Sequence, residues 1–289
     1  MEHADDKRSR FYTVQEIKER LSISTLVFRG YRSICEASLA ELAENGISRI
    51  ELIESPEQYD MTDSGSMQHV AQICRNTGIE IVAYHAHKTD FAGIDGAALS
   101  EEQRLARVDI CRRQISTLLE LGGTVWGCHA RNTDDGIVRK SYEELVRDVE
   151  GTGAVITIEN FPRQGTHVED RVAFLDELDH PQIGMILDIG HVQTADGEGV
   201  LTRPGGPTEI IGLCGHRLQH VHLHGFVDSD HYPPLCAGDG IQWVELFREL
   251  KASNYPGSLN FEPAGEPRRT GSIVATGRFP ERIVEMATR

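Results

Sequence analysis

The stretch Leu218–Gly240 (LQHVHLHGFVDSDHYPPLCAGDG) joins a short apolar run to a dense group of histidines and aspartates. Residues 218–223 alternate between apolar and polar side chains, which is typical of a β-strand. Successive side chains of a strand point to opposite faces, so we expect His220, His222 and His224 to lie on one face. Three imidazoles beside carboxylates suit zinc, manganese or iron better than they suit an apolar core. The alternative interpretation of this stretch alone is a surface loop rich in histidine and aspartate.

The same order, a short apolar segment followed by a helical segment, recurs along the whole chain. Eight segments are predicted as strands: Ile23–Phe28, Arg49–Ile53, Glu80–Tyr84, Thr124–Gly127, Ala154–Ile158, Gly184–Leu187, Gln219–Leu223 and Ser258–Phe261. Most are continuously apolar, as expected for strands that are buried on both faces of a parallel sheet. Eight such units in 289 residues favour a single closed (β/α)8 TIM barrel over an open doubly wound sheet. No GxGxxG fingerprint follows the first strand, so no nucleotide cofactor is expected.

Capping boxes predict where several helices begin. They are Thr13 with Glu16, Ser100 with Gln103, Ser141 with Glu144, and Thr166 with Glu169. The first of these helices precedes the first strand, and we expect it to close the bottom of the barrel. The chain is therefore divided into an N-terminal extension and helix, residues 1–22, and the barrel, residues 23–289.

Composition limits the classes of partner. The formal net charge is -16, and affinity for nucleic acids depends on a basic surface, so no nucleic-acid partner is expected. No apolar run approaches the length of a membrane span, and the polar start MEHADDKRSR does not resemble a signal peptide. We therefore expect a cytoplasmic protein without a membrane partner. Pairing of the outer helices into a homo-oligomer is left open.

Ionisable residues fall repeatedly at the ends of the expected strands, where barrels of this kind carry their chemistry. From the second strand to the eighth, these ends carry Glu54, His85, His87, His129, Glu159, Asp188, His191, His222, His224, Asp228, Asp230, His231 and Glu262. The strand ends converge on one ring, so residues far apart in sequence become neighbours. A ring of carboxylates and imidazoles without compensating basic residues predicts a bound metal ion.

Four of these residues form the expected metal site: Glu159, Asp188, His222 and Glu262. Three carboxylates and one imidazole are a hard, mostly oxygen donor set that fits manganese, magnesium, cobalt or zinc. Taken singly, each acid has a structural alternative; Asp188, for example, could accept backbone amides. His191 is expected to hydrogen-bond the substrate or to hold a second ion. His85 and His129 are either further ligands or ordinary histidines of the rim.

The chain resembles the xylose-isomerase-like barrel superfamily, which includes sugar isomerases, ketose 3-epimerases, inosose dehydratase and the apurinic endonuclease barrel. The resemblance covers essentially the whole chain and rests on ITIEN (156–160), GMILDIGH (184–191), HVHLHG (220–225), GDGIQWVELFRELKASNYPG (238–257) and SLNFEP (258–263). In the sugar-acting members, residues similar to the four named above hold one divalent cation. The resemblance implies that Glu159 and Glu262 flank a sugar-like substrate and move protons.

We therefore expect a divalent-metal-dependent isomerase or epimerase of a small sugar, sugar phosphate or polyol-derived ketone. It would work through proton transfer and a metal-stabilised enediolate, with Glu159, Glu262 and His191 as catalytic residues. A hydroxyl leaving group would turn the same start into a dehydratase or lyase reaction. Asp228 stands where an arginine usually follows the metal histidine of the epimerases, and His224 where a lysine is common. Both differences move the site toward more metal donors.

The apurinic-endonuclease-like members hold three zinc ions, and the chain also resembles their ligand set in order. The similar residues are His85, His129, Glu159, Asp188, His191, His222, Asp230, His231 and Glu262, with Asp228 as an alternative to Asp230. A multi-zinc site activates water and clamps a phosphate, so the alternative function is a multi-zinc phosphoesterase. Basic residues that could meet a small phosphate are Lys88, Arg131, Arg163 and Arg203. A third alternative, a barrel that binds without catalysis, is disfavoured because both glutamates are present.

Overall fold

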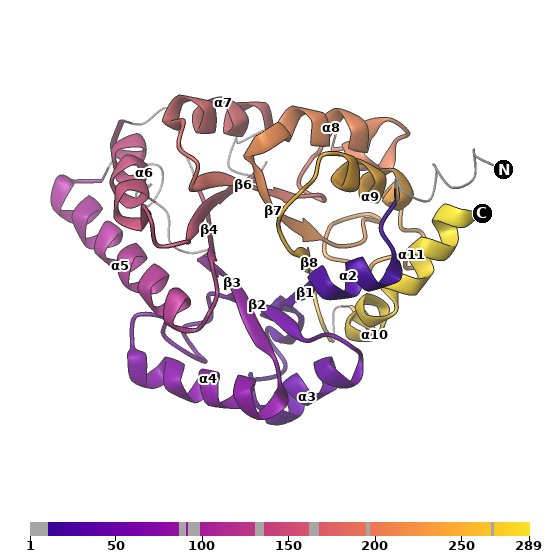
Figure 1. Ribbon diagram of the computed structural model, residues 1–289, viewed down its shortest axis with the longest axis horizontal. Coiled ribbons are helices and arrows are strands. Elements are labelled where there is room, and N and C mark those ends of the chain that lie inside the picture. The colour runs from indigo at the N-terminus through magenta and orange to yellow at the C-terminus, as the bar shows by residue number, and fades with distance from the viewer. Residues whose placement is uncertain are drawn as a thin grey trace.

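The structure is a computed structural model that describes residues 11–86, 91, 99–130, 136–161, 168–194, 197–266 and 269–289. Its centre is a closed barrel of parallel strands in the order β1 to β8, in which β8 also pairs with β1 (Figure 1). The strands are β1 (Leu21–Ser24), β2 (Arg49–Ile53), β3 (Glu80–Ala86), β4 (Val125–His129), β5 (Val155–Glu159), β6 (Ile183–Asp188), β7 (Leu218–Leu223) and β8 (Leu259–Phe261). The expected (β/α)8 barrel is confirmed.

Helices surround the barrel and cover the outer faces of its strands (Figure 1). They are α2 (Val14–Arg20), α3 (Glu36–Glu44), α4 (Ser64–Thr77), α5 (Glu101–Glu120), α6 (Gly136–Val149), α7 (Val168–Leu178), α8 (Gly206–Cys214), α9 (Trp243–Ala252), α10 (Ser272–Gly277) and α11 (Phe279–Thr288), with short 3-10 helices at Thr25–Phe28, Val200–Thr202 and Gly215–Arg217. Burial of the strands on both faces explains why most of their residues are apolar.

Two of the four expected capping boxes are present, and the one expected at Thr166 lies outside the described residues. The side chains of Thr13 and Ser100 each accept a hydrogen bond from the backbone N–H three residues later, and the box is completed in return. The box expected at Ser141 is wrong, because α6 already begins at Gly136. The Ser141 hydroxyl instead donates to the carbonyl oxygen of Ile137 (2.7 Å), a bond that serine can make inside a helix.

The first strand is shorter than the expected Ile23–Phe28 and ends at Ser24. The Ser24 hydroxyl accepts a hydrogen bond from the N–H of Leu26 (3.3 Å), which begins a 3-10 turn. The hydroxyl of Thr25 accepts another from the N–H of Ile53 at the end of β2 (2.9 Å). The end of β1 is therefore bound to its neighbour through side chains, beyond the point where the strand pairing stops.

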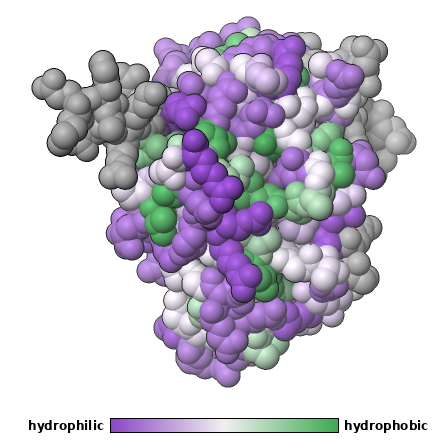
Figure 2. All heavy atoms as spheres, turned by 90° about the vertical axis from the view of Figure 1, so that its right-hand side faces the viewer, coloured by the Kyte–Doolittle hydropathy of each residue, from purple (hydrophilic) through white to green (hydrophobic). Residues whose placement is uncertain are grey.

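Helix α2 lies at the amino-terminal end of the barrel. Arg20, its last residue, donates hydrogen bonds to the carbonyl oxygens of Tyr255 (2.7 Å) and Gly257 (3.1 Å), just before β8. Because α2 lies at the amino-terminal end, it does not cover the carboxyl ends of the strands, where the ionisable residues lie. On the side that carries α11, hydrophilic residues predominate and hydrophobic ones form small separate patches (Figure 2). Among the described residues, no helix has both the length and the hydrophobicity to cross a membrane.

Candidate metal centre

Strands β2 to β8 and the loop after β7 bring together a group of mostly buried carboxylates and imidazoles, the candidate metal centre. Its members are Glu51, His85, His129, Glu159, Asp188, His191, His220, His222, His224, Asp230, His231 and Glu262. The parallel register explains part of this proximity, since His129 lies opposite Glu159 and Asp188 lies opposite His222. His87, also expected on this rim, lies outside the described residues.

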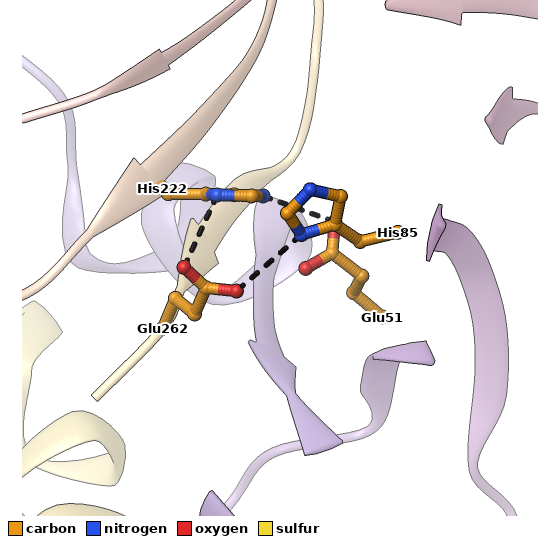
Figure 3. Close-up of side chains that lie close together, drawn as sticks. All are labelled: Glu51, His85, His222 and Glu262. Carbon is orange, nitrogen blue, oxygen red and sulfur yellow. Dashed lines mark hydrogen bonds and ion pairs between the residues drawn. The ribbon is translucent and has the colours of Figure 1, made fainter. Parts of the chain in front are cut away.

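His222 is the centre of the four residues expected to form the metal site. Its Nδ1 lies 3.2 Å from Oε2 of Glu262, 3.6 Å from Oε2 of Glu159 and 3.9 Å from Oδ2 of Asp188. All four side chains are buried. Figure 3 shows the His222 ring with Glu262 at its Nδ1 edge. One ring nitrogen thus faces three carboxylates that come from three different strands or strand ends.

His85 and His129 lie beside the same carboxylates. His85 Nε2 is 3.0 Å from Oε2 of Glu159, and His85 Nδ1 is 3.7 Å from Oε1 of Glu262 (Figure 3). His129 Nε2 lies 3.1 Å from the same Oε2 of Glu159. Donor atoms of His85, His129 and Glu159 all lie within 4.8 Å of one another. Both histidines could therefore hold a metal ion together with Glu159.

Asp188 is held by backbone amides and also faces the imidazoles. Its Oδ1 accepts hydrogen bonds from the N–H groups of Gly190 (2.9 Å) and His191 (3.0 Å), and His224 Nε2 lies 3.0 Å away. Asp188 therefore does accept backbone amides, as one interpretation of the sequence had it, but only through Oδ1. Its other oxygen, Oδ2, faces His222. The amide contacts fix the carboxylate in place without occupying its second oxygen.

Asp230, rather than Asp228, belongs to this group. Asp230 Oδ2 lies 3.3 Å from Nε2 of His191. The other ring nitrogen of His191, Nδ1, lies 3.0 Å from Oε1 of Glu159. Asp228 is exposed and accepts a hydrogen bond from the hydroxyl of Tyr232 (2.6 Å). Of these two aspartates, Asp230 is therefore the one that lies beside the buried histidines.

His231 joins the group from the loop after β7. Its backbone N–H donates to His224 Nδ1 (2.9 Å), and its own Nδ1 donates to the carbonyl oxygen of Glu262 (2.7 Å). It has a φ of 58°, which is uncommon for a residue other than glycine. Donor atoms of Asp188, His191 and His231 lie within 4.8 Å of one another.

Glu51 and His220 complete the centre, and the sequence reasoning missed the role of Glu51. It lies within β2, three residues before Glu54, and is buried. Its Oε2 is 2.8 Å from His220 Nε2 and 3.3 Å from His222 Nε2 (Figure 3). The available signal was an acid inside an otherwise apolar strand, RIELI, because a buried charge needs partners.

Burial and ion pairing act in opposite directions on these groups. Burial raises the pKa of Glu159, but the charges of His129 and His85 and the hydrogen bonds from His129 and His191 together hold that pKa well below the usual value. Glu262 has its pKa lowered in the same way, with His222 as its main partner. Burial lowers the pKa of His222, but Glu262 and Glu51 together raise it well above its usual value. Without a metal ion, the ionised carboxylates of Glu159 and Glu262 therefore face a protonated His222.

The centre opens to solvent on the side of His129, Asp230 and His231. Their side chains are 12%, 21% and 25% exposed, whereas the other members are almost fully buried. The ring of Phe161 stacks on His129 with centroids 4.6 Å apart and meets the edge of His191 at 4.9 Å. A substrate would thus approach past one aromatic ring and three polar side chains.

The residues present fit a divalent cation. His222 Nδ1 is buried and has no hydrogen-bond partner of good geometry among the described residues, yet three carboxylates face it. An imidazole nitrogen among carboxylate oxygens is a donor set that manganese, cobalt, zinc or magnesium accepts. A cation of this kind would also balance the carboxylates after the imidazoles release their protons.

Of the basic residues expected to meet a phosphate, only Arg203 is among the described residues. Lys88, Arg131 and Arg163 lie outside them. Arg203 is paired with Glu209 at 2.6 Å, and both side chains are more than half exposed. It therefore has no contact with the metal donors described above.

Comparisons with known proteins agree with this architecture. The chain is 24% identical over 278 residues to "Uncharacterized protein MJ1311" of Methanocaldococcus jannaschii, covering 89% of this chain and 86% of the relative. A xylose isomerase-like TIM barrel protein from Mycobacterium smegmatis, solved in complex with magnesium, is similar with a TM-score of 0.69 and 16% identity, covering 96% of this chain and 98% of that one. A D-allulose 3-epimerase from Methylomonas sp., solved with D-allulose, has a TM-score of 0.68 and 19% identity, covering 92% and 96%.

The family comparison covers most of the sequence. The family model described as xylose isomerase-like TIM barrel matches residues 39–278, which include every strand from β2 to β8. All members of the buried centre described above lie within these residues. The protein therefore belongs to the xylose isomerase-like TIM barrel family.

Proposed function

We propose that the protein is a metal-dependent isomerase or epimerase of a small, sugar-like ketone. The observation that carries this proposal is the position of Glu159 and Glu262, whose carboxylates lie 3.6 and 3.2 Å from the same ring nitrogen of His222. Two ionised carboxylates beside one cation site can remove and return a proton on a bound substrate. The similarity in fold to a D-allulose 3-epimerase supports the substrate class.

The proposed chemistry needs both glutamates as ligands and proton carriers. A divalent cation bound at His222 would polarise adjacent carbonyl and hydroxyl oxygens of the substrate and so acidify the α-hydrogen. One glutamate then removes that proton. The other returns it to the opposite face in an epimerisation, or the proton moves to the neighbouring carbon in an isomerisation. We expect His191, which contacts Asp230 near the open side, to hydrogen-bond a substrate hydroxyl in exchange for that contact.

Exchange with solvent tests this proposal directly. The metal-loaded protein should incorporate deuterium at the α-carbon of its ketose substrate when a ketose panel is incubated in deuterated water. Glu159→Gln and Glu262→Gln should each slow exchange about 10²- to 10⁴-fold, the usual contribution of a general acid or base. Glu80→Gln is the matched control, because Glu80 is an exposed residue that pairs with Arg49 at the start of β3. Full turnover by Glu159→Gln with metal still bound would rule out its role as proton carrier.

A second candidate, a multi-metal phosphoesterase, is favoured by the way the donor groups overlap. Glu159 belongs both to the group with His85 and His129 and to the group with Asp188 and His222. Asp188 belongs in addition to the group with His191 and His231. Shared carboxylates between adjacent donor groups can bridge two cations, and a multi-metal site can activate water against a phosphoester. The net charge of -16 disfavours nucleic acid as its substrate.

The number of metal ions per chain separates the two candidates. One ion per chain, together with deuterium exchange, supports the isomerase or epimerase. Two or three ions, together with phosphate release from small phosphoesters or cleavage of an abasic oligonucleotide and no deuterium exchange, transfer the assignment to the phosphoesterase. Metal analysis of protein purified without chelators gives this count.

A further inference from the structure

We infer that Glu51 is a positioning residue that directs His222 Nδ1 toward the cation. This inference rests on the metal site proposed above, but not on which reaction the site performs. Glu51 lies on β2 and His222 on β7, so the contact crosses the inside of the barrel. Glu51 Oε2 lies 3.3 Å from His222 Nε2, at the ring edge away from the cluster of carboxylates. The Nε2–H therefore donates to Glu51, which leaves the lone pair of Nδ1 for a metal ion.

Donor atoms of Glu51, His85, His222 and Glu262 lie within 4.8 Å of one another, but Glu51 faces the Nε2 edge of His222 and so is not a ligand of a cation bound at Nδ1. The two nitrogens of an imidazole point away from each other, and Figure 3 shows Glu262 at one end of the ring and Glu51 at the other. Glu159 and Asp188 also lie on the Nδ1 side. A cation bound to Nδ1 therefore has the ring between it and Glu51.

Glu51 is itself held by a chain of buried polar groups. His220 Nε2 lies 2.8 Å from its Oε2, and the side-chain amide of Asn260 donates to its Oε1 (3.1 Å). The Ser22 hydroxyl then donates to Asn260 Oδ1 (2.8 Å). These partners come from β7, β8 and β1, all neighbours in the barrel. Both carboxylate oxygens of Glu51 thus have partners, and the carboxylate is fixed opposite His222.

The decisive variant is Glu51→Gln, which keeps the size of the side chain but removes its charge. Zinc affinity, measured by competition with a chelator, should fall about 10- to 100-fold, the usual effect of removing the partner of a metal-binding histidine. In the zinc-loaded protein, the proton resonance of His222 Nε2–H should move upfield because its hydrogen bond to a carboxylate is lost. The visible spectrum of the cobalt-loaded protein should keep its shape, because the set of ligands is unchanged. Glu80→Gln serves as the matched control for all three measurements.

Two outcomes would overturn the inference. Unchanged zinc affinity in Glu51→Gln would leave Glu51 with a structural role only, and a changed cobalt spectrum would make it a ligand. If Glu51→Gln does not fold, Asn260→Ala gives the same test, since it removes one support of Glu51; a loss of a few-fold in zinc affinity is expected, and no loss contradicts the inference. If the wild-type protein binds neither zinc nor cobalt, the proposed metal site fails first and this inference with it.

Discussion

At the scale of single residues, Gly190 explains why the buried histidines can lie so close together. It follows Asp188 by two residues, and its N–H donates to the Asp188 carboxylate (2.9 Å). A Cβ atom at this position would overlap the ring of His224 and lie 2.9 Å from Cβ of Asp230. The absence of a side chain at Gly190 therefore makes room for His224 and Asp230, two members of the candidate metal centre.

Substitution of Gly190 by alanine should displace both neighbours. We expect Gly190→Ala to lower the free energy of unfolding by about 1–3 kcal/mol, as overpacking of a dense interior does, and to weaken metal binding. Gly212→Ala is the control, since it lies in α8 with no atom within 4 Å of the added Cβ and should be neutral or stabilising by up to about 1 kcal/mol. Denaturant unfolding with and without metal measures both effects. Equal stability of the two variants would contradict the expected crowding.

The imidazoles should make metal binding depend on pH. Burial lowers the pKa of His85, but Glu159 and Glu262 raise it from 6.5 to about 9 in the metal-free protein. Its proton stabilises the metal-free fold fully below pH 6.5, and this contribution is lost as the pH rises through about 9. A metal ion must displace that proton, so metal affinity should rise between pH 6.5 and about 9, by about tenfold per unit for each proton displaced. Calorimetric titration across this range measures it, and a constant affinity would show that His85 stays outside the ligand set.

At the scale of secondary-structure elements, the side chains of β7 alternate between the inside of the barrel, where the ionisable groups lie, and the apolar core outside it. His220 and His222 point into the barrel toward Glu51, whereas Val221 and Leu223 belong to the apolar core under the helices. This follows from the strand period of two residues. The alternation seen in the sequence therefore determined which side chains reach the metal centre.

Neighbouring residues of β7 should thus respond differently to truncation. Leu223→Ala should lower the free energy of unfolding by about 2–5 kcal/mol, the usual cost of a cavity at a fully buried leucine, with little change in metal affinity. His222→Ala should abolish metal binding, because it removes the nitrogen that three carboxylates face. Unfolding curves and metal titrations of both variants test this. Loss of metal binding in Leu223→Ala with an intact fold would mean that the two faces are not independent.

At the scale of the whole molecule, closure of the barrel concentrates negative charge that the chain must balance. Glu51, Glu159, Asp188 and Glu262 come from separate strands or strand ends and are all buried together. Among the described residues, these carboxylates contact imidazoles, an asparagine side chain and backbone amides. Such a site stabilises the fold most when a cation replaces the imidazole protons.

Removal of metal should therefore destabilise the protein. Free metal at about 100 times its Kd should stabilise the fold by about 2.7 kcal/mol relative to chelator-treated protein. For a chain of this size, each kcal/mol corresponds to roughly 2–4 °C in Tm. Thermal unfolding with added manganese or zinc, and after chelation, measures the shift. The His222→Ala variant should show no such shift, and an equal shift in that variant would place the stabilising cation elsewhere.

The sequence by itself determined the barrel and most of the centre. Continuous apolar strands that alternate with capped helices predict the fold, because each strand must be buried on both faces. Glu159, Asp188, His222 and Glu262 could be named because parallel strand ends converge in any closed barrel. The helix start at Ser141 was wrong because serine can also bond within a helix, and local pattern alone does not distinguish the two cases.

Only the tertiary structure decided how these residues are paired. It selected Asp230 over Asp228, because the loop after β7 directs Asp230 toward His191 and leaves Asp228 exposed. It also placed Glu51 against His222, 171 positions away in the chain. Sequence spacing determines the direction of a side chain within its own strand, but a contact across the barrel depends on how eight strands close and stagger. For that physical reason, most residues of the candidate metal centre could be predicted from the sequence. Which carboxylate each histidine nitrogen contacts could not.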